Sequence, residues 1–170
     1  MRLKKTVAQL AVLGMGMTGI FSVNATASQV AATADTTFNL TLVPPSCTLT
    51  APSSITLADQ KPGTTKDNNT FNLEIACEMG VATKIKASIV KGTQKTDTSM
   101  ALLNGVADSG AALTLRYNNT DVMLTGNDAD TFCAGDQQQR TCVITPRLVT
   151  SQNVVYGTAS GSVKFDIIYS

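Results

Sequence analysis

The chain has 170 residues, of which 15% are charged and 43% are hydrophobic. This balance permits a compact core and differs from that of a disordered chain. The chain contains no histidine and no tryptophan, so it lacks the side chain that most often acts as general base near neutral pH and as a neutral metal ligand. The composition therefore argues against a triad enzyme or a zinc hydrolase, and we expect a protein that is not an enzyme and uses no cofactor or metal.

The first 27 residues have the pattern of a cleaved signal peptide. A basic start, Met1-Arg-Leu-Lys-Lys5, precedes an apolar run over residues 10–23, and Ala25-Thr26-Ala27 supplies a cleavage site with small residues. The alternative is a membrane anchor, but the run is shorter than the roughly 20 apolar residues of a spanning helix. We expect export to an oxidising compartment, which leaves 143 residues for one domain.

The charge of the exported part does not favour a nucleic-acid partner. Three of the 13 basic residues lie in the signal peptide, so ten remain against 12 acidic residues. The resulting formal charge is −2, and the basic residues form no stripe.

Apolar residues alternate with polar residues along most of the remaining chain. This period of two predicts half-buried β-strands, and no segment shows a sustained helical stripe. Short strands separated by turn residues such as Pro62-Gly63 and Asn104-Gly105 predict an all-β sandwich. The predicted strands are residues 38–42, 71–77, 84–89, 113–117 and 163–169, with Ile55 and Leu57 marking a shorter one.

The four cysteines are Cys47, Cys77, Cys133 and Cys142. No pair has the C-x-x-C spacing of a redox motif or a zinc site, and in an oxidising compartment structural disulfides are expected. Three pairings are possible. We favour Cys47 with Cys77 and Cys133 with Cys142, because the second pair brackets a short polar loop, residues 134–141.

Asn127-Asp-Ala-Asp130 is similar to the start of a calcium-binding loop. Phe132 stands where the third ligand would be, and no glycine follows at the sixth position. The segment is better interpreted as a solvated loop, and no metal site is predicted.

Three features together resemble the structural pilin subunits of the chaperone–usher pathway, as in type 1 and P pili. Phe38 stands nine residues before Cys47, and Cys77 ends an alternating strand, as in the family's first disulfide. The chain ends in an alternating strand with a penultimate aromatic residue, Tyr169. Gly157 is the fourteenth residue from the C-terminus, where the family places a glycine before its last strand.

The resemblance implies an incomplete immunoglobulin-like β-sandwich that lacks its last strand and is completed by a donor strand from another chain. It also implies a bacterial surface fimbria that contributes to cell adhesion, and the partners would be other pilin subunits, a periplasmic chaperone and the outer-membrane usher. The pilin domain would be residues 38–170. The chaperone would pair with the open edge of the terminal strand, and the residues expected along that edge are Gly157, Val163, Phe165, Ile167 and Tyr169.

Residues 28–37 are the predicted donor strand. Val30, Ala32, Ala34 and Thr36 share one alternating face, and the segment is left over before the first predicted core strand. The alternative is a disordered terminus without a function.

A second class of function stays open at this point. A self-complete secreted sandwich, or a minor adhesin, could bind a host glycan or receptor through the loop closed by Cys133 and Cys142, with Asp136, Gln137 and Arg140 as recognition groups. The sequence does not distinguish a major subunit from a minor one.

Overall fold

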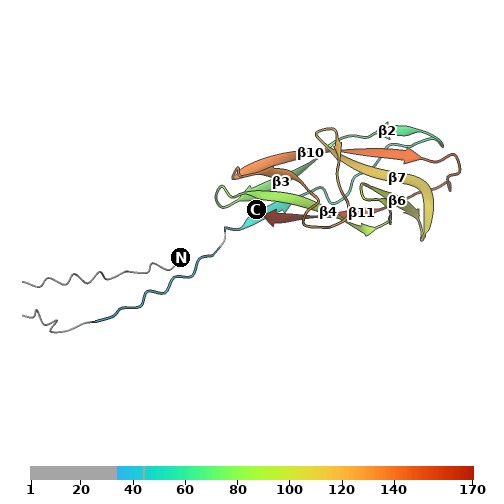
Figure 1. The fold of residues 1–170 in the computed structure, drawn as a ribbon. Helices are drawn as coiled ribbons and strands as arrows, with labels where there is room; N and C mark the ends of the chain where they lie inside the picture. The colour runs from blue at the N-terminus through green and yellow to red at the C-terminus, as the bar shows by residue number, and fades with distance from the viewer. Residues whose placement is uncertain (1–33, 44) are drawn as a thin grey trace, which may run out of the picture. The chain divides into compact units, whose positions relative to one another are not determined.

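The protein is described here by a computed structural model that covers residues 34–43 and 45–170 (Figure 1). Contacts divide the chain into Met1–Thr41 and Leu42–Ser170, and the strands of the described residues all lie in the second unit. The predicted signal peptide, Val30 and Ala32 lie outside the described residues. In the described part of the chain, no helix is long and apolar enough to cross a membrane.

In the described residues, eleven strands form two sheets, and all their pairings are antiparallel. The larger sheet has the order β1-β3-β10-β7-β6-β5, with β2 against β10 and β8 against β7, and the smaller sheet has the order β11-β4-β9. This architecture confirms the predicted all-β fold class. The larger sheet comprises β1 (Cys47–Thr50), β2 (Thr65–Asp67), β3 (Phe71–Cys77), β5 (Thr93–Thr96), β6 (Ser99–Asn104), β7 (Ala107–Tyr117), β8 (Thr120–Asp121) and β10 (Gln139–Thr150). The smaller sheet comprises β4 (Thr83–Lys91), β9 (Thr131–Gly135) and β11 (Ser162–Tyr169).

Alternating apolar side chains build the core where the pattern predicts it. β3 alternates strictly between buried and exposed residues, with Leu73 and Ile75 almost fully buried. Ile85 and Ala87 of β4 are equally buried and contribute to the same core from the smaller sheet. Alternation is therefore a reliable guide where both neighbouring strands belong to this chain.

Two predicted strands are absent. Residues 38–42 form no strand, and the side chains of Phe38, Leu40 and Leu42 are 91%, 81% and 82% exposed. The segment that holds Ile55 and Leu57 also forms no strand. Alternation shows that a segment has one apolar face, but it does not say whether the core that covers this face belongs to the same chain.

Both disulfides have the pairing that the sequence favours. Cys47 is bonded to Cys77, which joins β1 to β3, and Cys133 is bonded to Cys142. The second bond connects β9 of the smaller sheet to β10 of the larger one. The predicted loop 134–141 is shorter than expected, because β9 extends to Gly135 and β10 begins at Gln139.

The domain formed by Leu42–Ser170 has two opposite ends, which are named here by a residue at each. At the first, which we call the Cys47 end, Thr83 pairs with Tyr169, and the amide of Cys77 donates to the carbonyl of Gln138. The start of β1 and the C-terminus therefore lie at the same end. At the opposite Val106 end, the β6–β7 hairpin turns after Asn104, which pairs with Ala107. β11 begins at this end, and Figure 1 shows β6 on the far side from the C-terminus.

Candidate functional site

One edge of the smaller sheet is open. β11 pairs with β4 along its whole length, from Ser162 to Tyr169, and among the described residues no strand pairs with its other edge. The inward side chains of β11 are correspondingly only half-buried, namely Val163, Phe165 and Ile167. An edge strand with unpaired backbone groups and partly exposed core residues is a site for the addition of another strand.

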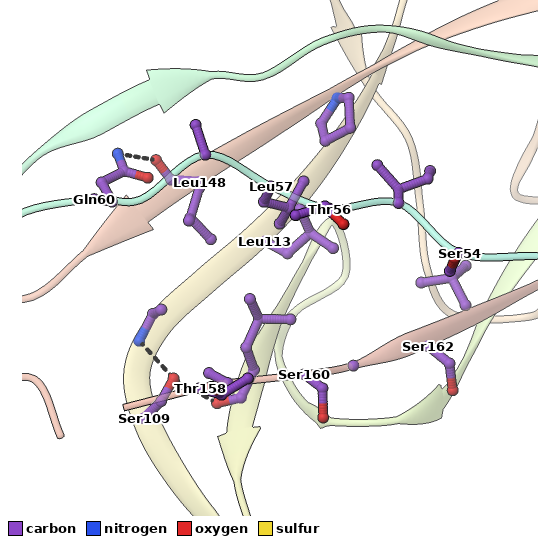
Figure 2. A pocket seen from close by; sticks show the side chains of 18 of the residues that line it. Ser54, Thr56, Leu57, Gln60, Ser109, Leu113, Leu148, Thr158, Ser160 and Ser162 are labelled. Carbon is purple, nitrogen blue, oxygen red and sulfur yellow. Dashed lines mark hydrogen bonds between the residues drawn. The ribbon is translucent and has the colours of Figure 1, made fainter. Parts of the chain in front are cut away.

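A groove of about 680 Å³ runs beside this edge. One wall is the irregular segment 51–60, and the other is formed by residues 154–163 and the first half of β11. Figure 2 shows Leu57 on the first wall and Ser160 and Ser162 on the second, with Leu113 and Leu148 between them. The groove therefore exposes the interior of the sandwich between two roughly parallel walls.

The floor of the groove consists of apolar side chains arranged along β7. Leu115, Leu113 and Ala111 follow one another at intervals of two residues, from the middle of the domain toward the Val106 end. Leu148 of β10 pairs with Leu113, so it lies at the middle level. Since successive residues on one face of a strand are about 6.6 Å apart, this spacing matches the side chains on one face of an added strand.

Segment 51–60, which forms one wall of the groove, is not a strand, so its polar groups form individual hydrogen bonds in place of a ladder. The amide of Ala58 donates to Oδ1 of Asn68 at 2.8 Å, and Nε2 of Gln60 donates to the carbonyl of Leu148 at 3.2 Å. Oε1 of Gln60 is buried and accepts no hydrogen bond from the residues that the structure describes. A buried acceptor without a donor is costly, so an N–H group supplied from the groove would be stabilising there.

The predicted edge residues divide into two groups. Gly157, Val163 and Phe165 line the groove, whereas Ile167 and Tyr169 lie farther along β11, toward the Cys47 end, and do not. Gly157 has a φ of +128°, a conformation that disfavours side chains. A Cβ atom at Gly157 would also lie 3.1 Å from Nδ2 of Asn104, so the backbone and the space at this position both suit glycine.

The described part of the N-terminal segment, residues 34–43, has an exposed apolar face. Ala34 and Thr36, from the predicted donor, are exposed, as are Phe38, Leu40 and Leu42. Residues 38–42 were predicted as a strand of the domain, but their alternation equally fits a strand that is added to another molecule. If a sequence contains more apolar strands than one sandwich can cover, at least one of them must be covered by another molecule. Such an excess is the signal that distinguishes the two cases.

Arg140, one of the residues proposed for receptor recognition, forms hydrogen bonds within the domain. Its guanidinium donates to the carbonyl of Gly135 at 3.0 Å, and to the carbonyl and Oγ1 of Thr83 at 2.9 and 2.7 Å. Burial lowers the pKa of Arg140 from its usual value. The side chain thus joins the two sheets, since it connects β10 to β9 and β4. Within the described residues, no cluster of acidic or cysteine side chains could hold a metal ion.

Comparison with known proteins identifies the fold. No family model and no curated protein sequence matches the chain. Among solved structures, the chain is similar to a chaperone–usher pilus studied for the uncoiling of its rod, with a TM-score of 0.58, 17% identity, and coverage of 82% of this chain and 97% of the other. It is also similar to PapA, the rod subunit of the P pilus, with a TM-score of 0.58, 13% identity, and coverage of 73% and 99%.

A third similar structure is the CsuC–CsuE chaperone–tip adhesion subunit pre-assembly complex from the archaic Csu pili of Acinetobacter baumannii. The TM-score is 0.50 at 13% identity, and the match covers 75% of this chain and 40% of the other. The fold is therefore that of chaperone–usher pilus subunits, with the sandwich open beside its last strand.

Proposed function

We propose that this chain is a structural subunit of a bacterial surface fimbria and polymerises by donor-strand exchange. The observation that carries the proposal is the open edge of β11 beside an apolar groove, in a chain that also has an exposed alternating apolar segment ahead of its domain. One subunit would insert its N-terminal segment into the groove of the next. The chain contributes to cell adhesion as part of the fimbria and acts as a building unit, not as an enzyme.

The donor face extends beyond the segment first predicted. Phe38, Leu40 and Leu42 continue the alternation of Ala34 and Thr36, so one strand over residues 34–43 would present all five side chains on the same face. The three large side chains match the three levels of the groove floor. Because each is more than 80% exposed in the free subunit, its transfer into the groove would contribute roughly 1.5–3 kcal/mol.

Small side chains suit the first half of the donor for a geometric reason. All described strand pairs are antiparallel, and a donor antiparallel to β11 would run from the Cys47 end to the Val106 end. Ala34 and Thr36 would then lie opposite the part of β11 that contains Ile167 and Tyr169, which does not line the groove. At these positions backbone hydrogen bonds to the strand edge would dominate.

The partners follow from the exposed edge. Before assembly, a periplasmic chaperone would cover β11 and the groove, because an uncovered edge beside exposed core residues favours aggregation. An outer-membrane usher would then exchange the chaperone for the donor strand of another subunit. The predicted signal peptide is consistent with this route from the periplasm to the cell surface.

The proposal is tested by providing the donor within the same chain. Residues 34–43 are fused after Ser170 through a short flexible linker, which suffices because the C-terminus lies at the Cys47 end, where an antiparallel donor begins. Linking makes the insertion intramolecular, at an effective concentration in the millimolar range. The fused chain should be monomeric in sedimentation and should unfold at a much higher temperature than the exported chain alone.

Two controls locate the effect. A fusion in which Phe38, Leu40 and Leu42 of the added copy are replaced by serine keeps the backbone but lacks the apolar face, and it should give little stabilisation. A fusion of residues 28–37 tests the shorter donor. If the unfused chain is already a monomer with the same midpoint as the fused chain, the groove needs no donor, and the protein is a self-complete sandwich.

A further inference from the structure

An exposed apolar patch lies beside the groove at the Val106 end. Val106 is 98% exposed at the tip of the β6–β7 hairpin, and Val155 and Tyr156 are 52% and 81% exposed on the neighbouring loop. The hairpin and the loop are joined, because Nδ2 of Asn104 donates to the carbonyl of Tyr156 at 3.3 Å. We refer to Val106, Val155 and Tyr156 as the Val106 patch.

The fold of a single subunit does not use this patch. Val106 lies in a turn, where a polar residue or glycine is usual, and its nearly complete exposure means that it contributes nothing to the described core. Scattered apolar residues are ordinary on protein surfaces, but three on two connected loops beside an open groove are characteristic of a contact surface.

The direction of the donor strand determines what comes next to the patch. A donor that runs antiparallel to β11 ends at the Val106 end of the acceptor, with Leu42 and Val43 as its last residues in the groove. Only three residues separate Val43 from Cys47, so the two can be at most about 14 Å apart. The Cys47 end of the donor subunit must therefore lie close to the Val106 end of the acceptor.

The Cys47 end carries an apolar group that could meet the patch. Met79 is 59% exposed and follows Glu78, whose amide donates to the carbonyl of Ser46 at 3.0 Å. Met79 is therefore fixed near the point where the N-terminal segment joins the domain. Methionine is flexible and polarisable, and it packs well against aromatic side chains such as that of Tyr156.

On the basis of the donor-strand exchange proposed above, we propose that the Val106 patch is a second contact between consecutive copies of this chain. It receives the surface around Ser46 and Met79 of the subunit whose donor strand fills the groove. The partner is a second copy, because the linker of three residues brings that surface there in any polymer of this chain. The contact fixes the angle between consecutive domains, which the donor strand alone would leave to the linker.

Crosslinking of assembled polymer tests this contact. The described cysteines are all in disulfides, so Val106→Cys together with Met79→Cys introduces the reactive thiols. Polymer of the double variant is treated with a short bismaleimide and then denatured in hot detergent. We expect a ladder of covalent dimers, trimers and longer species. A matched control combines Val106→Cys with Val143→Cys, which is also exposed but lies in the middle of β10, and it should remain monomeric.

The outcomes separate the two proposals. If the native chain forms no polymer, donor-strand exchange fails and the second contact fails with it. If polymer forms but the double variant gives no more ladder than the control, the second contact is refuted and donor exchange stands. If the double variant assembles poorly, Val106→Asp is tested instead. It should leave the thermal midpoint of the in-chain donor fusion unchanged and lower the temperature at which polymer dissociates, and an unchanged dissociation temperature would refute the contact.

Discussion

Asp67 is the centre of an ion-pair network on the outer face of the larger sheet. Nε and Nη2 of Arg147 donate to its two carboxylate oxygens at 2.6 and 3.0 Å, and Arg116 lies 3.9 Å away and also pairs with Asp121. The network therefore links four strands, β2, β10, β7 and β8. The hydrogen bonds from Arg147 hold the pKa of Asp67 below its usual value of 3.8.

This lowered pKa predicts a pH-dependent effect of Asp67→Asn. A carboxylate whose pKa is lower in the folded state stabilises the fold above its unfolded pKa, and the stabilisation disappears as the pH falls through the folded pKa. Asp67→Asn should therefore lower stability at neutral pH, and the difference from wild type should shrink below about pH 4. Urea unfolding of the donor fusion at several pH values measures it. A difference that is constant with pH would mean that the charge of Asp67 is not involved.

At the scale of single elements, the Cys47–Cys77 bond links β1 covalently to β3. Among the strands that carry a disulfide, β1 is the shortest. β1 has four residues, and among the described strands it pairs with β3 alone. The bond closes a separation of 30 residues, for which loop entropy predicts a stabilisation of about 3.6 kcal/mol. Replacing Cys47 and Cys77 by serine should lower the unfolding free energy of the donor fusion by a similar amount, as measured in urea.

The Cys133–Cys142 bond provides the comparison for this prediction. It closes a separation of only nine residues, so its removal should cost less, by about 1 kcal/mol. If removing either bond has the same effect, loop entropy is not the main contribution, and the packing of the sulfur atoms in the core would explain the equal cost.

Much of the strand structure could be predicted from the sequence. The sequence did not show whether each apolar face is covered by the same chain or by another one. Alternation located β3, β4, part of β7 and β11, because their inward faces pack on the core of the same chain, although that of β11 is only partly covered. It placed residues 38–42 in the domain by the same reasoning, although nothing local distinguishes a core strand from a donor. β10 was missed, because Pro146 and several polar residues interrupt its pattern, and its place between β3 and β7 is a property of the whole sheet.

The candidate site was predictable in part for a related reason. Gly157, Val163 and Phe165 were found from their positions relative to the C-terminus, and they line the groove. Segment 51–60 was not recognised as a groove wall, since a wall without regular structure has no periodic signal. The role of Arg140 depends on contacts with Thr83, which is 57 residues away in sequence, and no local pattern reports such a contact.

At the scale of the whole molecule, the proposed contact joins two different surfaces, the donor segment and the groove. Such a contact is heterologous and does not close on itself unless the subunits form a ring, so it generates an open polymer with two unlike ends. One end would expose an empty groove or its chaperone, and the other an unused donor segment.

This polarity predicts that a chain without its donor acts as a terminator. A variant that begins at Pro45 after the signal peptide keeps the groove but has nothing to insert into another subunit. Expressed together with the native chain, it should enter one end of each fibre and shorten the fibres as its share rises, which electron microscopy can measure. Fibres of unchanged length that contain the variant throughout would mean that residues before Pro45 are not the donor.

The position of the Cys47–Cys77 bond has a mechanical consequence for such a fibre. When the fibre is pulled, tension passes from the inserted donor segment into the domain of the same subunit. It enters that domain at Cys47, the first residue of β1. The four residues of β1 could be peeled from the sheet one hydrogen bond at a time, but the disulfide transmits the force directly to Cys77 and into β3, in the interior of the larger sheet. The covalent bond thus converts unzipping at the edge into shear across a central strand, which would allow the fibre to bear a larger force before any domain opens.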